Sequence, residues 1–164
     1  MEDSTADDSL SRLFKAHPLL FEGQGRAPAN SDLPPGWFDL VNRLCSDLER
    51  QLGPEVAAQI TVQQIKEKFG TLRFYAQLGD SRRVHVDLLD GHRINTIVVD
   101  TVATSSDLSP PGAIRDRLFS LIDAACEASG SICERCGSQG ALRPLGWRRT
   151  LCDEHYQAAR LARG

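Results

Sequence analysis

The residues whose types and spacing could support chemistry lie at the C-terminal end of the chain. Two residues separate Cys133 from Cys136, and two residues separate Cys152 from His155. The resulting pattern, Cys-x2-Cys-x15-Cys-x2-His, is typical of a tetrahedral zinc site. Three thiolates and one imidazole fill all four positions around the metal, which predicts one structural zinc ion. Iron is the alternative metal, because thiolate-rich tetrahedral sites also suit it.

The residues around these ligands indicate how they are positioned. Gly137 lets the backbone curl around the metal, and a helix over the second ligand pair would place both of its members on one face. Residues 141–143 and 147–150 can form a short hairpin with its turn at residues 144–146. A knuckle, a hairpin and a helix in this order look like a treble-clef zinc finger. Residues 131–164 are therefore predicted to be a zinc-finger subdomain.

Length and composition limit what the whole chain can be. Its 164 residues, 41% of them hydrophobic and 25% charged, fit one globular domain with a small appendage. No apolar run reaches the roughly 20 residues of a membrane span, and the acidic N-terminus lacks the basic flank of a secretory signal. We therefore expect a cytoplasmic protein without disulfides or membrane contact. Cys45 and Cys126 lie on apolar helix stripes and are expected to be inert core residues.

Hydrophobic periodicity predicts two amphipathic helices in a core domain of residues 37–130. One helix is expected over residues 37–52, where apolar side chains recur at three- and four-residue steps between a Pro-Pro-Gly start and a Gly-Pro stop. The second has the same pattern over residues 114–129 and ends at Gly130. These helices would bury one face each against a common core.

Alternating residues predict two antiparallel hairpins between the helices. Residues 60–78 alternate around a bend at Gly70, and residues 84–98 alternate around a turn at Asp90 and Gly91. For the arm before Gly70 a short helix is the alternative, because Val62, Ile65 and Phe69 also recur at helical spacing. In the second hairpin one face is expected to carry apolar residues, namely Val84, Val86 and Leu88. The fold class is therefore expected to be α+β, with two helices on one face of a mainly antiparallel sheet of about four strands.

The first 36 residues carry weaker signals. Residues 23–36 are rich in glycine, proline and other turn formers, so we expect residues 1–36 to form an irregular N-terminal arm. Leu19, Leu20 and Phe21 are its candidates for contact with the core.

Residues 66–75 read Lys-Glu-Lys-Phe-Gly-Thr-Leu-Arg-Phe-Tyr, and they stand between a Pro35-Gly36-Trp37 tripeptide and the cysteine-rich tail. This combination resembles a family of small uncharacterised proteins from bacteria and their phages that join a KEKFG-x-LRFY stretch to a C-terminal cysteine-rich finger. The likeness covers roughly residues 34–78 and 113–157, and residues 81–103 look like an insertion relative to shorter members. It implies the architecture but no activity, and His155 stands where such proteins often have a cysteine.

Residues 66–75 have two interpretations. In the first, their apolar side chains are core, Gly70 is the turn and the charges are solvated. In the second, the stretch is a recognition strand that presents Lys66, Lys68, Arg73 and Tyr75. The sequence favours the two interpretations equally.

A non-enzymatic module that binds another protein is the function the sequence favours. The chain has no phosphate-binding loop, no open metal site and no paired catalytic groups. An immunity protein, an inhibitor or a phage accessory factor would fit these absences and the small size. The identity of the partner and the oligomeric state do not follow from the sequence.

Nucleic-acid binding through the finger is the first alternative. Arg143, Arg148 and Arg149 beside Trp147 could contact phosphates and stack on a base, and the cations of residues 66–75 could extend that patch. The opposing interpretation packs Trp147 over the metal and leaves the arginines solvated. The acidic balance of the chain, with a net charge of −3, weakens the nucleic-acid hypothesis.

A metal-dependent nuclease is the second alternative, because treble-clef scaffolds also host nucleases. These enzymes add a catalytic histidine and an open metal site. The candidates for such groups are His85 and His92 with Asp87 and Asp90. A histidine on a hairpin is usually just exposed, so no catalytic residue is assigned.

Overall fold

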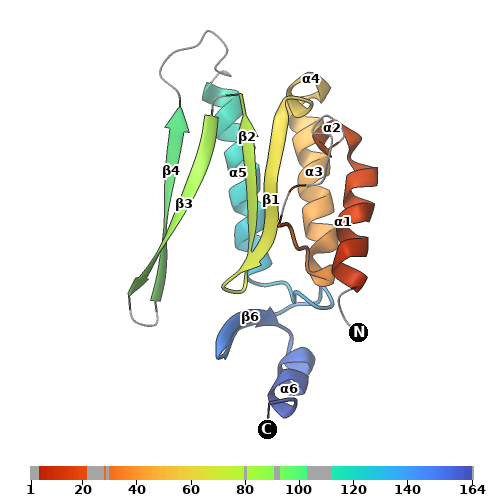
Figure 1. The fold of residues 1–164 in the computed structure, drawn as a ribbon, viewed down its shortest axis with the longest axis vertical. Helices are drawn as coiled ribbons and strands as arrows, with labels where there is room; N and C mark the ends of the chain where they lie inside the picture. The colour runs from red at the N-terminus through yellow and green to blue at the C-terminus, as the bar shows by residue number, and fades with distance from the viewer. Residues whose placement is uncertain are drawn as a thin grey trace.

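A computed structural model of the chain describes residues 4–21, 28, 30–79, 81–90, 93–102 and 112–163. Within these residues the fold is mixed α+β, as expected (Figure 1). The helices are α1 (Ser4–Ala16), α2 (Pro18–Phe21), α3 (Phe38–Leu52), α4 (Pro54–Ala57), α5 (Gly112–Ser129) and α6 (Asp153–Leu161), with a 3-10 turn over Pro35–Trp37 before α3. The strands are β1 (Ile60–Lys68), β2 (Thr71–Leu78), β3 (Ser81–Asp90), β4 (Arg93–Val102), β5 (Ala141–Leu145) and β6 (Trp147–Leu151).

The core lies between the β1–β2 hairpin and the two predicted helices. α3 and α5 stand side by side behind this hairpin, and α5 contacts β2 directly (Figure 1). β2 can contact the helices because its side chains alternate between the two faces of the sheet. The buried face carries Leu72, Phe74, Ala76 and Leu78, and the side chains between them are partly exposed. The face that meets the helices is therefore apolar, and Arg73 and Tyr75 lie on the opposite face, as expected.

The N-terminal segment is helical where we expected an irregular arm. Residues 4–21 form α1 and α2, so that expectation is wrong over this range. α1 packs on α3 and buries Leu10 and Leu13, three residues apart on one helix face. Leu20 and Phe21 are also buried, as anticipated, whereas Leu19 is 42% exposed, contrary to that expectation. The prediction failed because the apolar repeat of α1 is short, and such a helix is stable only when it packs on the rest of the protein. The turn formers that follow it were the stronger signal in the sequence.

A buried histidine fixes the contact between these N-terminal helices and α3. His17 is 4% exposed. Its Nδ1 lies 2.9 Å from Glu49 Oε2, and its Nε2 lies 3.0 Å from Asn42 Oδ1. Both partners belong to α3, so the polar ring joins α1 and α2 to the core without leaving a ring nitrogen unpaired.

Strands β3 and β4 extend the sheet but leave the core. The strand order is β1-β2-β3-β4, all antiparallel. In the described residues β3 meets β2 at only two positions, where Ser81 lies opposite Leu78 and Arg82 opposite Gln77. Beyond them the β3–β4 hairpin diverges from β2 (Figure 1). The expected four-stranded sheet is confirmed, whereas its predicted turn at Gly91 lies outside the described residues.

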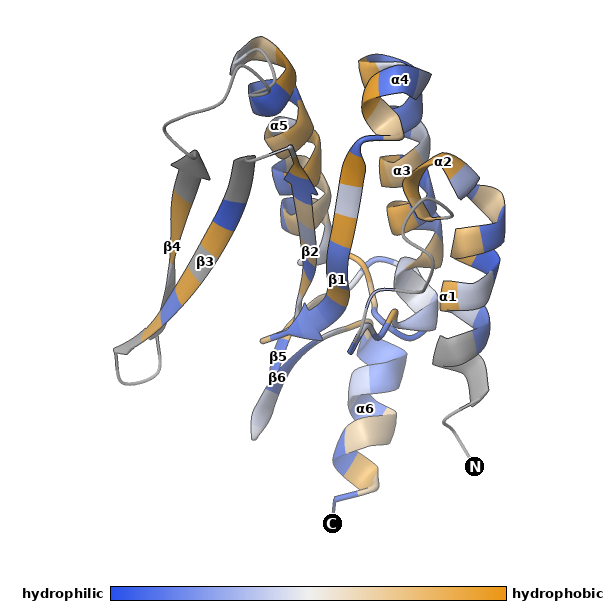
Figure 2. Ribbon diagram, turned by 45° about the horizontal axis from the view of Figure 1, so that its top comes forward, coloured by the Kyte–Doolittle hydropathy of each residue, from blue (hydrophilic) through white to orange (hydrophobic). Residues whose placement is uncertain are grey.

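The apolar face predicted for the β3–β4 hairpin is not part of the core. Val86 is 42% exposed and Leu88 is 47% exposed. Figure 2 shows apolar positions along β3 and β4, away from the helices that cover β1 and β2. A pattern of alternating residues identifies a strand face but does not say what covers it, and here no described helix does.

Asp87 ties this hairpin to the polar face of β1 and β2. Its Oδ2 lies 2.7 Å from Lys68 Nζ, and its Oδ1 accepts a 2.6 Å hydrogen bond from the Thr96 hydroxyl. Arg73 Nη2 lies 3.5 Å from Oδ1. Burial acts to raise the pKa of Asp87, but the contacts with Lys68, Thr96 and Arg73 outweigh burial and lower this pKa to about 2.

We expect Asp87→Asn to lower the free energy of unfolding at neutral pH by about 2 kcal/mol, because the folded-state pKa falls from 3.8 to about 2. A depressed carboxyl pKa stabilises the fold above the unfolded-state value, and this stabilisation is lost as the pH falls toward the folded-state value. The difference between wild type and variant should therefore shrink to about half near pH 3. Urea unfolding of both proteins at the two pH values measures it, and a difference independent of pH would contradict the assignment.

Candidate metal centre

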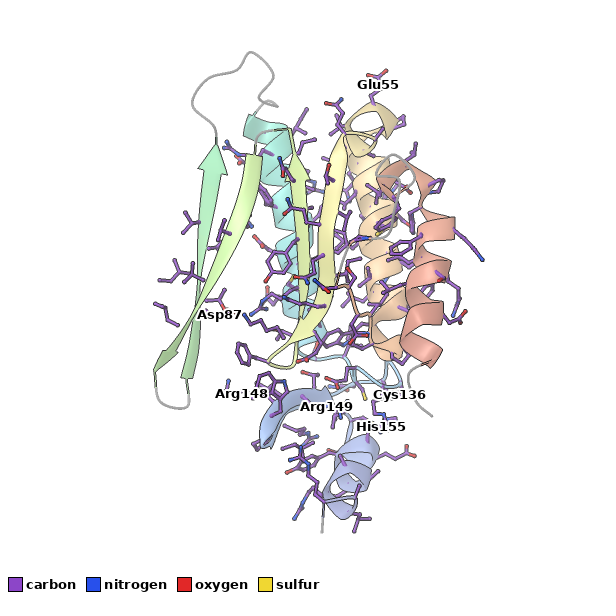
Figure 3. The ribbon with its side chains drawn as sticks, viewed as in Figure 1. Glu55, Asp87, Cys136, Arg148, Arg149 and His155 are labelled. Carbon is purple, nitrogen blue, oxygen red and sulfur yellow. The ribbon has the colours of Figure 1, made fainter. Side chains whose placement is uncertain are left out.

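The four predicted ligands come together at the N-terminus of α6. Cys133 and Cys136 lie on the turn before β5, Cys152 is the N-cap of α6, and His155 lies in the first turn of that helix. Their ligand atoms all lie within 4.8 Å of one another. Figure 3 places Cys136 and His155 at the junction between the core and α6. The predicted cluster is confirmed, and its arrangement is compatible with one metal ion.

The distances between the ligand atoms fit a tetrahedral zinc ion. Cys136 Sγ lies 3.8 Å from Cys152 Sγ, and Cys133 Sγ lies 3.5 Å from His155 Nδ1. Zinc bonds of about 2.3 Å to sulfur and 2.05 Å to nitrogen, at tetrahedral angles, separate two sulfurs by about 3.8 Å and a sulfur from a nitrogen by about 3.6 Å. A third separation, 3.2 Å between Cys152 Sγ and His155 Nδ1, is slightly shorter than the expected distance from sulfur to nitrogen. The donor set is therefore compatible with zinc, which His155 would bind through Nδ1.

Local groups shape the metal-binding turn and favour the thiolate of Cys136. Gly137 has a φ of +76°, a conformation that glycine adopts at little cost, and its N–H donates to Cys133 O over 2.9 Å. The N–H of His155 lies 3.5 Å from Cys152 Sγ, at the positive end of the α6 dipole. Hydrogen bonds from Ser138 are the main cause of a lowered pKa at Cys136, about 6. This thiol is therefore ready to bind a metal as thiolate near neutral pH.

A metal held by these four side chains would be structural. Four protein ligands leave no coordination position for water or substrate. The finger has a small core of its own, in which Cys133, Leu145 and Leu151 are buried beside the half-buried Tyr156. Such a core is too small to stabilise the segment alone, so a metal that joins the turn, the end of β6 and α6 would supply most of the stability.

The finger docks on the core at Gly36. The Gly36 N–H donates to Glu134 O over 2.9 Å, and the buried Trp37 donates from Nε1 to Ile132 O over 2.8 Å. A Cβ on Gly36 would lie 2.6 Å from Gly137 N and still closer to Cys133 O. Only glycine therefore allows the Pro35-Gly36-Trp37 turn to approach the backbone of the metal-binding turn.

A second docking contact lies at Gly70, in the β1–β2 turn. Thr150, fully buried on β6, donates from Oγ1 to Gly70 O over 2.6 Å. A Cβ on Gly70 would overlap Leu142 of β5, and Gly70 has a φ of +80°. Phe69, whose φ is +55°, precedes it and places its ring 5.3 Å from the Trp147 ring. The Pro35-Gly36-Trp37 tripeptide and residues 66–75 thus each contribute a glycine that contacts the finger.

An ion pair inside the finger lies close to the same junction. The Glu134 side chain is 5% exposed, and its Oε1 lies 2.5 Å from Arg149 Nη2. The Glu134 N–H donates to Thr150 O over 2.9 Å. Glu134 thus joins the metal-binding turn to β6 by side chain and backbone at once.

The predicted partner-binding cations are mostly paired inside the molecule. Arg143 contacts Asp153, and Arg149 contacts Glu134. Lys68 and Arg73 contact Asp87. Figure 3 shows Arg148 and Arg149 on the finger hairpin, below Asp87. Lys66 lies over the Tyr75 ring, with its Nζ 5.6 Å from the ring centre.

Trp147 is not among the side chains packed in the small core around Cys133, whereas one of the two interpretations placed it over the metal. Its ring lies against the Phe69 ring at a tilt of 32°, and the residue is 55% exposed. The first interpretation of residues 66–75 is confirmed in part, and the second, a recognition strand, stays a prediction. Leu72 and Phe74 are core and Gly70 is the turn, whereas Phe69 is half-exposed and meets the finger.

The structure assembles no catalytic group from the nuclease candidates in its described part. Asp87 is held by Lys68, Arg73 and Thr96. His92 and the side chains of His85 and Asp90 lie outside what the structure describes. A hydrolytic centre is therefore not supported by any contact among the described residues.

The two cysteines outside the cluster behave as core residues. Cys45 is fully buried, and burial strongly raises the pKa of its thiol. Cys126 is partly buried, and burial raises its pKa to about 11. Both thiols are protonated at neutral pH, as expected for inert positions.

Three residues of the junction were not predicted as functional: Gly36, Phe69 and Glu134. The signal for Gly36 was its place in a Pro-Gly-Trp turn, where a glycine beside a large aromatic often marks a close backbone approach. No sequence signal distinguishes Glu134 from a solvated acid, because its burial depends on a long-range partner. Phe69 lies at a turn, where an exposed aromatic cannot be told from a buried one.

Comparisons with known proteins gave no match. No protein-family model fits the chain, and neither the curated proteins nor the solved structures contain a match to it. The likeness to small bacterial and phage proteins therefore rests on the motifs themselves. Among the described residues, no helix combines the length and the apolar character that crossing a membrane requires.

Proposed function

We propose that this chain is a zinc-stabilised, non-enzymatic module that binds another protein through the Trp147 surface, which consists of Phe69, Leu142 and Trp147. The observation that carries this proposal is the 55% exposure of a tryptophan that is already held by a neighbouring ring. Leu142, 43% exposed, lies beside the same turn. Rigid, half-exposed aromatic residues are the groups that most often dominate the energy of protein interfaces.

The metal would serve this surface by fixing its geometry. The order of a cysteine turn, the β5–β6 hairpin and α6 with its two ligands supports assignment of residues 131–163 to a treble-clef-like finger. One Zn²⁺ would hold the hairpin so that Trp147 rests on Phe69 of the core. A cytoplasmic location, where thiols stay reduced, suits these free cysteines.

The charges favour a protein over a nucleic acid as the partner. Lys68, Arg73, Arg143 and Arg149 each face a carboxylate of this chain, which reduces the charge they offer to phosphates. Lys66, Arg148 and Tyr75 would lie at the margin of the interface. An immunity protein, an inhibitor or a phage accessory factor remains the type of module proposed.

The proposal excludes catalysis by the described residues. The four metal ligands would leave no open position, and the Asp87 carboxylate is committed to Lys68, Arg73 and Thr96. A protein of this kind would act by covering a site on its partner.

Affinity capture from a native lysate tests the Trp147 surface. We expect Trp147→Ala to weaken capture of a specific partner at least tenfold, because loss of a hot-spot tryptophan costs about 2 kcal/mol or more. The matched control is Leu161→Ala, which removes an apolar side chain that is 83% exposed on α6, and it should leave capture unchanged. Zinc content measured for both variants shows that the finger is intact.

Two outcomes would contradict the proposal. If Trp147→Ala captures the same proteins as wild type, the surface is not the interface. If capture disappears after nuclease treatment and declines steeply with salt, the ligand is a nucleic acid.

A further inference from the structure

β4 is an edge strand with an unusual surface. It pairs with β3 over its whole length, from Arg93 opposite Asp90 to Val102 opposite Ser81. It is the last strand of the sheet, and no described element lies beyond it in either view of the ribbon (Figures 1 and 2). One row of its backbone N–H and C=O groups is therefore open to pairing with another strand.

The centre of β4 is apolar on both faces. Ile97 is 48% exposed, and Val98 and Val99 are each 44% exposed. Edge strands are normally protected by lysine, proline or a bulge. The residues of β4 include no lysine and no proline, and its register against β3 is regular. Its charged residues, Arg93 and Asp100, lie outside the apolar centre, so residues 97–99 themselves carry none of these protections.

The residue types of β4 read the same in both directions. Val98 is flanked by two apolar residues, and the residue types on its two sides then match pair by pair. Going outward, the pairs are apolar Ile97 and Val99, polar Thr96 and Asp100, polar Asn95 and Thr101, and apolar Ile94 and Val102. An antiparallel copy centred on Val98 would therefore place apolar opposite apolar and polar opposite polar at all nine positions from 94 to 102. No like charges would meet, because Asp100 would lie opposite a threonine.

Other centres do not give this match. A pairing centred on Ile97 would place Thr96 opposite Val98 and Asn95 opposite Val99. A pairing centred on Thr96 would place Asn95 opposite Ile97. Two residues that lie directly opposite each other on neighbouring strands point to the same face of the sheet. The two-fold axis must therefore pass through a residue, and not between two residues.

We propose that a second copy of this chain pairs with β4 in the antiparallel direction, with the two-fold axis at Val98. The two sheets would then form one continuous sheet, and the open edge of each copy would be removed. The interface is isologous, as in most homodimers, because each β4 contacts the same strand of the other copy. The exposed Ile97 of each copy would lie opposite Val99 of the other, across the axis.

This interface is separate from the Trp147 surface. β4 belongs to the part of the sheet that diverges from β2, whereas Trp147 lies on the finger. Loss of the dimer should not remove Trp147-dependent capture, and loss of that capture should not remove the dimer. The two proposals can therefore fail independently.

Analytical ultracentrifugation of the zinc-loaded full chain tests this proposal, with a pair of valine-to-lysine variants. The wild type should sediment as a species with twice the 18.0 kDa mass of one chain. Val98→Lys puts two like charges opposite each other at the axis and should weaken the dimer at least about 30-fold. Val86→Lys is the matched control, because Val86 is 42% exposed on the same hairpin but lies on β3, one strand away from the edge.

Amide exchange supplies a second readout that does not depend on mass. In the wild type, protection of the outward-facing β4 amides, which do not bond to β3, should fall on dilution, and in Val98→Lys it should be low at every concentration. A wild type that stays monomeric at high micromolar concentration would overturn the proposal. So would a Val98→Lys dimer as tight as wild type, and equal loss in Val86→Lys would assign the contact to the hairpin face instead of the edge.

Discussion

Removing the metal from the intact chain will unfold the finger and leave most of the core folded. Apparent zinc binding in isolated fingers is worth about 10–16 kcal/mol, far more than the small apolar cluster of Leu145, Leu151 and Tyr156 can supply. Hydrogen exchange after treatment with a chelator measures the effect. Amides of residues 132–161 should lose their protection, while those of α3, α5, β1 and β2 should keep most of theirs.

A ligand variant separates loss of metal from other effects of the chelator. Cys136→Ser should reproduce the exchange pattern of the chelated protein without chelator. Cys126→Ala removes a thiol from α5, outside the cluster, and should keep both the metal and the protection of the finger. Finger amides that stay protected in the chelated protein would contradict the structural role of the metal.

Gly36→Ala should have the largest effect of any single methyl group added to the junction. The new Cβ would lie 2.6 Å from Gly137 N and closer to Cys133 O, and both are backbone atoms that cannot move aside alone. We expect a loss of about 3 kcal/mol or more in the free energy of unfolding, at the upper end for overpacked sites. Chemical denaturation of the zinc-loaded protein measures this loss.

Gly112→Ala is the matched control for this substitution. Gly112 begins α5, and a Cβ there would meet only the end of the flexible Arg115 side chain, 3.9 Å away. Alanine also favours the helix, so this variant should be as stable as wild type or slightly more stable. If the two variants had equal stability, the finger would not be docked at Gly36.

The sequence was sufficient for the features that depend on local spacing. The four metal ligands follow from their separation in the chain, because a metal requires its ligands at one point whatever the fold around them. α3, α5 and the β1–β2 hairpin follow from periodicity, because one apolar face decides each of them. For the same reason Cys45 and Cys126 could be assigned to helix faces.

What could not be predicted depends on contacts between distant segments. The helix of α1 needs α3 to bury Leu10 and Leu13, and its own repeat is too short to be convincing. The exposure of the β3–β4 hairpin follows from its divergence after two pairs with β2, which no alternation of residues encodes. The contact between the Trp147 and Phe69 rings joins segments about 80 residues apart, and only the docked finger makes them neighbours.

Metal analysis of the purified full chain tests the central claim most directly. Elemental mass spectrometry with protein quantitation should find one zinc per chain, and Cys152→Ser should remove most of it. An absence of metal in the wild type, or full retention in the variant, would contradict the account. Iron at the same stoichiometry would confirm the metal site but show that its ion is not zinc.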